Sequence, residues 1–151
     1  MSGGQGKQIA AEAGDRGMGN ANPQNVLIVG AGPAGLCLAR ALATLGLEVD
    51  IVERQPEESL AEPTFDGREI ALSQGSISIL ERLDIWRRIP EMEIHPLRRA
   101  RVSDGAYEGF GIDADIFGKD RLGNFVSNHV IRAAAWQAVR DTRAGRVHAD
   151  A

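Results

Sequence analysis

The chain has 151 residues, enough for one domain with its own core, and its hydrophobic share of 43% and charged share of 25% are typical of globular proteins. The net charge of −4 argues against a nucleic-acid partner, because phosphate contacts require clustered Lys and Arg. A single cysteine, Cys37, excludes an intrachain disulfide, and the three histidines lack the spacing of metal ligands, so we expect no metal site.

Residues 1–24 hold six glycines, few large apolar side chains and no periodic pattern. Such a segment buries too little apolar surface to offset its ordering entropy, so we expect a disordered tail, with residues 25–151 forming the domain. The tail lacks the apolar core of a signal peptide, and no apolar run approaches the roughly 20 residues that span a bilayer. We therefore expect a cytoplasmic protein, and peripheral membrane contact stays open.

A strand–helix–strand unit is the first structure that the sequence predicts. Residues 25–30 form an apolar run typical of a parallel strand covered on both faces. Residues 33–45 form a helix, with Pro33 in the first turn, where a missing N–H is tolerated, and Gly46 as its stop. Residues 48–53 form the second strand. Crossovers of this kind are almost always right-handed.

Beyond this unit, residues 55–67 are polar and contain two prolines, which predicts a loop. Apolar residues at helical spacing then predict a helix over 73–83, with Ser73 or Ser76 as its cap. Pro90 stops the apolar face that continues after this helix.

The rest of the chain predicts an α/β fold, in which a parallel sheet is joined by a small antiparallel β element. Alternation and helical periodicity place antiparallel strands at 97–103 and 110–116 around the turn Asp104-Gly105, an extended piece at 125–130, a helix at 131–142 and a strand at 145–149. The last strand would be the third of the parallel sheet, with no helix after it. We therefore expect a fold that is incomplete at the C-terminus, from the front portion of a longer protein.

The glycine-rich turn after the first strand is typical of a dinucleotide site, and each glycine has a separate role. Gly30 allows the tight turn, Gly32 lets the backbone approach a pyrophosphate, and Gly35 lets the helix pack near the strand. The first-turn N–H groups and the helix dipole face the phosphates. The candidate cofactor-binding residues of this turn are Gly30, Ala31, Gly32, Pro33, Ala34 and Gly35.

Glu53 follows the last glycine by eighteen residues and closes the second strand. Its carboxylate can accept both ribose hydroxyls of an adenosine, whereas a phosphate at the ribose 2′ position would be repelled. The tightly held nucleotide is therefore expected to be FAD or NAD(H), and the glycines do not distinguish the two.

The choice between these two cofactors rests on a resemblance to a known family, which several later segments carry. They are Asp66-Gly-Arg68-Glu-Ile-Ala-Leu-Ser73, Gly75-Ser-Ile-Ser-Ile-Leu80, Arg101-Val-Ser-Asp104 and Phe125-Val-Ser-Asn-His-Val-Ile-Arg132. Together with the glycine turn and Glu53-Arg54, they resemble the class A flavin-dependent aromatic hydroxylases, most closely the branch that acts on ubiquinone precursors. The resemblance covers residues 25 to about 150 in consistent order.

The resemblance implies a Rossmann-like FAD-binding fold and an FAD-dependent monooxygenase. Such an enzyme takes electrons from NAD(P)H and hydroxylates a phenolic ring, here a ubiquinone precursor, through a flavin hydroperoxide. It also implies further cofactor contacts: Arg68 to the phosphates or the flavin, Arg54 to the adenine or ribose, and Ser127 or Asn128 to the flavin. We nominate no catalytic acid, base or nucleophile, because no such set of residues is visible.

Members of this family are more than twice as long, and their later parts carry a second cofactor motif and the substrate pocket. This chain alone is therefore expected to hold the ADP end of FAD incompletely and to catalyse nothing. Two other functions stay open on the sequence: an NAD-linked oxidoreductase that shares only the turn, and a non-enzymatic nucleotide-binding module. The sequence gives no indication of the oligomeric state.

Overall fold

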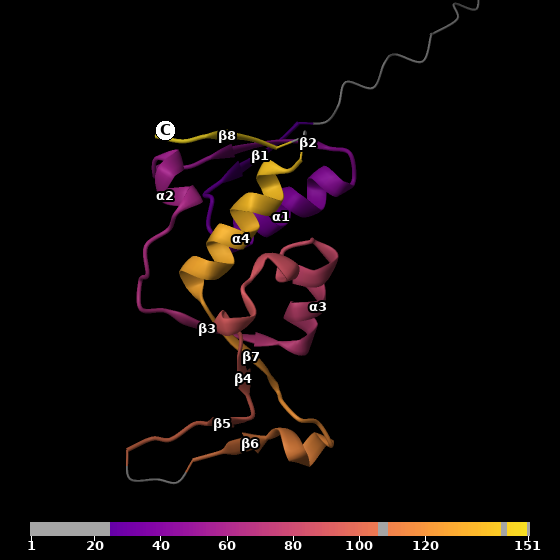
Figure 1. Ribbon diagram of the computed structural model, residues 1–151, viewed down its shortest axis with the longest axis vertical. Coiled ribbons are helices and arrows are strands. Elements are labelled where there is room, and N and C mark those ends of the chain that lie inside the picture. The colour runs from indigo at the N-terminus through magenta and orange to yellow at the C-terminus, as the bar shows by residue number, and fades with distance from the viewer. Residues whose placement is uncertain (1–24, 106–108, 143–144, 151) are drawn as a thin grey trace, which may run out of the picture.

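A computed structural model describes residues 25–105, 109–142 and 145–150, so the predicted tail 1–24 lies outside the described residues. The molecule is elongated, with a parallel sheet at one end, helices beneath it, and a two-stranded hairpin at the far end (Figure 1). This arrangement confirms the predicted α/β class with a parallel sheet and a separate antiparallel element.

The parallel sheet has the order β1-β2-β8. It consists of β1 (Asn25–Val29), β2 (Glu48–Val52) and β8 (Gly145–His148), and α1 (Pro33–Thr44) connects the first two. The strands pair in parallel, with Ile28 beside Ile51 and Ile51 beside Val147. The predicted strand–helix–strand unit and the third parallel strand are thus confirmed.

One face of this sheet carries the core of the molecule. Ile28, Val49 and Ile51 are at most 7% exposed, and they belong to the same buried cluster as Leu36 of α1. The helix α4 (Asn128–Arg140) packs against α1 and adds seven buried residues to this layer. The expectation that β1 is covered on both faces is wrong within the described residues, because its alternate side chains face outward without a covering element.

A second sheet has the order β3-β7-β4 and is antiparallel. It consists of β3 (Glu69–Ser73), β7 (Gly123–Ser127) and β4 (His95–Leu97). The strand β3 was not predicted. The pairing of β3 with β7 requires Gly123, since a Cβ there would lie 1.9 Å from the Leu72 carbonyl oxygen.

The helix α3 (Gln74–Arg82) follows β3 directly and confirms the predicted helix. Ser73 is its N-cap, with the side-chain oxygen accepting a hydrogen bond from the Ser76 backbone N–H, as expected. The predicted extended piece at 125–130 is wrong in its second half, because β7 ends at Ser127 and α4 begins at the next residue.

The short elements account for the other differences. The predicted loop 55–67 contains the helix α2 (Glu57–Ala61), which Leu60 anchors in the core at 1% exposure. Three short 3₁₀ helices, η1, η2 and η3, cover Trp86–Arg88, Glu91–Glu93 and Ala114–Phe117.

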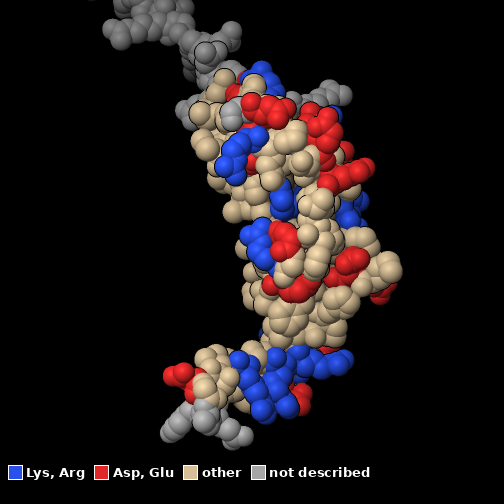
Figure 2. All heavy atoms as spheres, turned by 90° about the vertical axis from the view of Figure 1, so that its left-hand side faces the viewer, with Lys and Arg blue, Asp and Glu red and all other residues tan. Residues whose placement is uncertain are grey.

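The predicted strand 97–103 is interrupted. Its start belongs to β4 in the second sheet, and β5 (Arg99–Arg101) pairs instead with β6 (Gly111–Asp113) as a separate hairpin. The connection through residues 106–108 lies outside the described residues. Figure 2 shows acidic and basic side chains mixed over the body and a cluster of Lys and Arg at the hairpin end. Across the described part of the chain, no helix combines the length and apolar character needed to cross a membrane.

Candidate functional site

The glycine turn joins the end of β1 to the start of α1 and depends on glycine at two positions for its own shape. Gly30 has a φ of +102°, which side-chain-bearing residues rarely adopt, and its N–H donates to the Val52 carbonyl at 2.8 Å. A Cβ at Gly35 would lie 2.1 Å from the Gly30 carbonyl oxygen. The turn and the close approach of α1 to β1 therefore exclude side chains at both positions.

Gly32 differs from the other two glycines. Its φ of −75° and ψ of 177° suit any residue, and a Cβ built there meets no atom within 4 Å. It is the N-cap of α1, no side chain caps the helix, and Pro33 occupies the first turn. The space in front of the helix N-terminus is thus open, and the positive end of the helix dipole faces it.

The carboxylate of Glu53 reaches this turn from the end of β2. Its Oε2 accepts a hydrogen bond from the Ala31 backbone N–H at 2.7 Å, and its Oε1 accepts one from the Gln55 N–H at 2.9 Å. Partial burial raises the pKa of Glu53, but these N–H donors outweigh it, so the pKa lies below its ordinary value. Glu53 is therefore ionised near neutral pH, and its remaining lone pairs are available to a ligand.

Two arginines lie near Glu53. Arg54 is exposed at the end of β2, and its backbone N–H also lowers the pKa of Glu53. Arg132 of α4 donates to the Gln55 side chain at 2.6 Å, and its charge further favours the ionised carboxylate. Sequence reasoning did not single out Arg132, since only the packing of α4 beside the turn brings it there.

The predicted residues Arg68 and Asn128 are brought together by Asp66. The Arg68 Nε donates to Asp66 Oδ2 at 2.9 Å, and the Asn128 Nδ2 donates to the same oxygen at 2.7 Å. The Arg68 side chain is 66% exposed, and both its Nε and its Nη2 donate to Asp66. Ser127, by contrast, donates its hydroxyl proton to Glu69, which lies opposite it in the β3–β7 pair.

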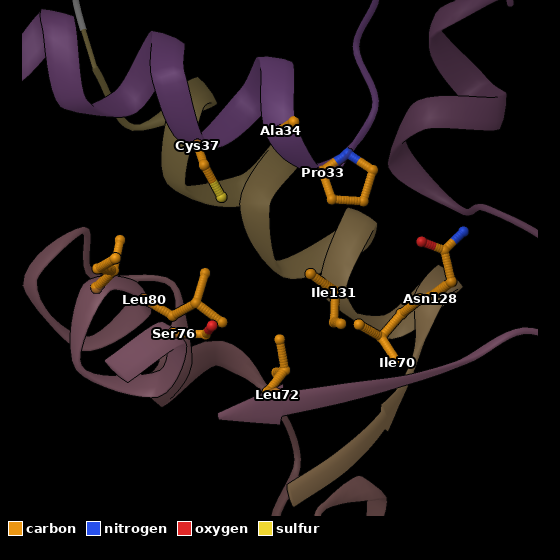
Figure 3. A pocket seen from close by; sticks show the side chains of 10 residues that line it. Pro33, Ala34, Cys37, Ile70, Leu72, Ser76, Leu80, Asn128 and Ile131 are labelled. Atoms are coloured by element: carbon orange, nitrogen blue, oxygen red, sulfur yellow. The ribbon is translucent and has the colours of Figure 1, made fainter. Parts of the chain in front are cut away.

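A pocket of about 540 Å³ lies between α1, β3, α3 and α4. Its lining is apolar apart from Cys37, Ser76 and Asn128, and Pro33 and Ala34 of the first turn of α1 form part of its wall (Figure 3). Cys37 is half-buried, and burial raises the pKa of its thiol. The pocket therefore continues from the glycine turn toward Asn128.

These residues fit a bound dinucleotide. Open N–H donors at a helix N-terminus suit a diphosphate, and an ionised carboxylate beside them suits ribose hydroxyls. A Cβ built at Gly32 would meet no atom within 4 Å, so the backbone there is open to the approach of a ligand.

Comparison with known proteins agrees with this geometry. Residues 24–145 match the family model described as the FAD binding domain. The chain is 47% identical over 120 residues to the ubiquinone hydroxylase UbiM of Neisseria meningitidis, covering 76% of this chain and 26% of that protein. It is 34% identical over 118 residues to the 3-demethoxyubiquinol 3-hydroxylase of Escherichia coli, covering 78% of this chain and 30% of that protein.

Solved structures share the fold. A variant of PqsL from P. aeruginosa superposes with a TM-score of 0.64 at 18% identity, covering 83% of this chain and 33% of that one. The flavin-dependent monooxygenase PieE, solved with FAD and substrate, superposes with a TM-score of 0.59 at 24% identity, covering 86% of this chain and 24% of that one. The chain thus spans between a quarter and a third of the length of these proteins.

Proposed function

Because the chain belongs to the FAD-binding domain family, we propose that residues 25–151 form the N-terminal part of the FAD-binding domain of a monooxygenase. The intact enzyme would hydroxylate a phenolic ring with electrons from NAD(P)H. Relatives named for ubiquinone and 3-demethoxyubiquinol hydroxylation support a ubiquinone precursor as the small aromatic substrate. Bound FAD would supply the redox and oxygen chemistry, and the residues of this chain would bind and orient it.

This proposal rests on the open space beside Gly32. The fold explains the glycines at 30 and 35 but not the one at 32, whose Cβ would meet nothing in the described residues. A glycine that the fold does not require, placed at a helix N-terminus beside an ionised Glu53, is explained by a diphosphate that approaches the backbone. We assign the phosphates to the turn 30–35 and the adenosine ribose to Glu53.

Roles for the remaining site residues are part of this proposal. Arg54 follows Glu53 directly and is exposed, which supports a contact with the adenine or ribose. Arg68 and Asn128 share Asp66 as their hydrogen-bond acceptor. We propose that Arg54 covers the adenine or ribose, that Arg68 contacts the phosphates or the flavin, and that Ser127 or Asn128 contacts the flavin. Asn128 is buried, at 4% exposure, and lines the pocket.

Substitution of Gly32 by Val tests the proposal in the intact polypeptide. The valine side chain would occupy the phosphate approach, so we expect FAD affinity to fall by at least about 100-fold. The melting temperature should stay close to that of the wild type, because a Cβ at position 32 meets no atom within 4 Å and the backbone angles there suit any residue. Fluorescence titration with FAD and thermal denaturation measure the two quantities.

The matched control is Gly35→Ala. Its Cβ would lie 2.1 Å from the Gly30 carbonyl, so this smaller substitution should destabilise the fold by roughly 1–3 kcal/mol. FAD retained by the Gly32→Val protein would show that the phosphates bind elsewhere. Tight binding of NAD without FAD would instead indicate a nicotinamide-dependent enzyme.

A further inference from the structure

Asp66 lies at the centre of a hydrogen-bond network, and none of the roles proposed above for the site residues includes it. Its Oδ1 accepts from the Arg68 backbone N–H at 3.1 Å, and its Oδ2 accepts from the Arg68 and Asn128 side chains. The Asn128 backbone N–H donates in turn to the Arg68 carbonyl at 2.9 Å. The loop before β3 and the first residue of α4, 62 positions apart in the chain, are thereby fixed to each other.

This network determines which way the Asn128 amide points. The hydrogen bond from Arg68, followed by that from Asn128, holds the pKa of Asp66 well below its usual range, so the carboxylate is ionised and only accepts hydrogen bonds. The amide nitrogen of Asn128 must therefore face Asp66, and the amide oxygen must face the other way. Figure 3 shows that oxygen on the side of Pro33 and the pocket.

The side chain of Asn128 lines the pocket, and its Oδ1 accepts no hydrogen bond from any residue that the structure describes. An acceptor oxygen left without a donor at the wall of a pocket is suited to a ligand. An amide oxygen accepts hydrogen bonds and offers none, so it favours a hydroxyl or N–H group over a phosphate oxygen.

We propose that Asp66 is a positioning residue, which orients Asn128 so that its side-chain oxygen accepts a hydrogen bond from a hydroxyl or N–H group of the ribityl–flavin part of FAD. This inference rests on the proposed function, because it assumes that the ADP half lies at the glycine turn. Asn128 and the first turn of α1 line the same pocket, so a ligand that passes from the diphosphate into the pocket meets this oxygen. Asp66 itself need not touch the cofactor.

The substitution Asp66→Asn tests this role in the intact polypeptide. A neutral amide at position 66 can donate as well as accept, so the Asn128 amide is free to turn its nitrogen toward the pocket. We expect the dissociation constant for FAD to rise about tenfold, whereas that for ADP should change less than about twofold. Titrations with FAD and with ADP on the same preparations measure both.

Asn128→Ala provides the second variant, because it removes the oxygen itself. It should also weaken FAD selectively, and adding Asp66→Asn to it should have little further effect, since the two residues act through one hydrogen bond. The matched control is Asp113→Asn, which removes the carboxylate partner of Arg99 on the β5–β6 hairpin. That control should leave both dissociation constants unchanged.

Two outcomes would overturn the inference. Equal loss of FAD and ADP affinity in Asp66→Asn would mean that Asp66 only supports the fold. Additive effects of Asp66→Asn and Asn128→Ala would mean that Asp66 does not act through the amide. A wild-type protein that binds ADP but shows no preference for FAD would contradict the proposed function, which separates that failure from these two.

Discussion

The carboxylate of Glu53 holds the glycine turn, and we propose that the same carboxylate binds the ribose of the ligand. One oxygen accepts the Ala31 N–H and the other accepts the Gln55 N–H, so the carboxylate fixes the turn before any nucleotide is bound. A preorganised acceptor of this kind binds ribose hydroxyls at a lower entropic cost than a mobile side chain. The same negative charge disfavours a phosphate at the ribose 2′ position.

The substitution Glu53→Gln separates the effect of the acceptor oxygens from the effect of the negative charge. The glutamine keeps one acceptor oxygen but loses the charge, so we expect ADP affinity to fall roughly tenfold. Discrimination against adenosine 2′,5′-bisphosphate should narrow, because repulsion of the 2′-phosphate is lost. Competitive titration of the wild type and the variant with the two ligands gives both ratios. An unchanged preference for the ligand without the 2′-phosphate would remove Glu53 from the ribose site.

The sequence sufficed to predict the residues of the glycine turn and Glu53 as candidates, because strand, turn, helix and acid follow one another locally. It did not predict the partners that tertiary packing supplies. Asp66 and Arg132 contact residues 62 and 77 positions away, and no local pattern carries those contacts. The sequence pattern assigned separate roles to Gly32 and Gly35, and the space around each Cβ differs in the same sense.

At the scale of elements, the end of α3 is held by a charged cluster around Asp84. This residue has a φ of +63°, and its carboxylate pairs with Arg87 and Arg88. Arg88 also reaches Asp141 beyond the end of α4, at 2.7 Å. The cluster therefore connects the end of α3 to α4, and the hydrogen bonds from Arg87 and then Arg88 lower the pKa of Asp84 to about 2.

We expect this cluster to stabilise the fold in a pH-dependent way. The pKa of Asp84 is lowered in the folded state, so its contribution is present above its ordinary value of 3.8 and is lost as pH falls toward about 2. Asp84→Asn tolerates the left-handed backbone but removes the charge, so it should lower the melting temperature by a few degrees near neutral pH. The difference from the wild type should shrink below about pH 4. A difference that is constant with pH would show that the backbone, and not the charge, is responsible.

The sequence predicted those helices and strands whose pattern lies within a few neighbouring residues. The strand–helix–strand unit and α3 carry their periodicity and caps within a few residues. The strand β3 was not predicted because its five residues lead directly into the cap of α3. The alternating exposure of its side chains arises from its pairing with β7, which is remote in sequence. The start of α4 was misplaced because Asn128 is fixed by Asp66 and Arg68, which are remote in sequence.

At the scale of the whole molecule, the two faces of the parallel sheet differ. One face is covered by α1 and α4, whereas the other carries charged pairs over β2 and β8, where Asp50 contacts Arg146 at 3.2 Å and His148 at 2.9 Å. Over β1 the same face is apolar, with Leu27 64% and Val29 83% exposed. Among the described strands β1 is also a sheet edge, since it pairs only with β2. An open apolar edge of this kind favours association with another chain.

We therefore expect the 151-residue chain to self-associate as its concentration rises, through β1. Replacing both Leu27 and Val29 by Thr puts a β-branched residue, which suits a strand, at each position and reduces the exposed apolar area. Association should therefore weaken while the melting temperature changes little. Leu45→Thr is the matched control, because Leu45 is 76% exposed but is the C-cap of α1 and belongs to no strand. Sedimentation velocity over a concentration series measures the association. If the control reduces association as much as the double substitution does, general surface hydrophobicity and not the β1 edge is the cause.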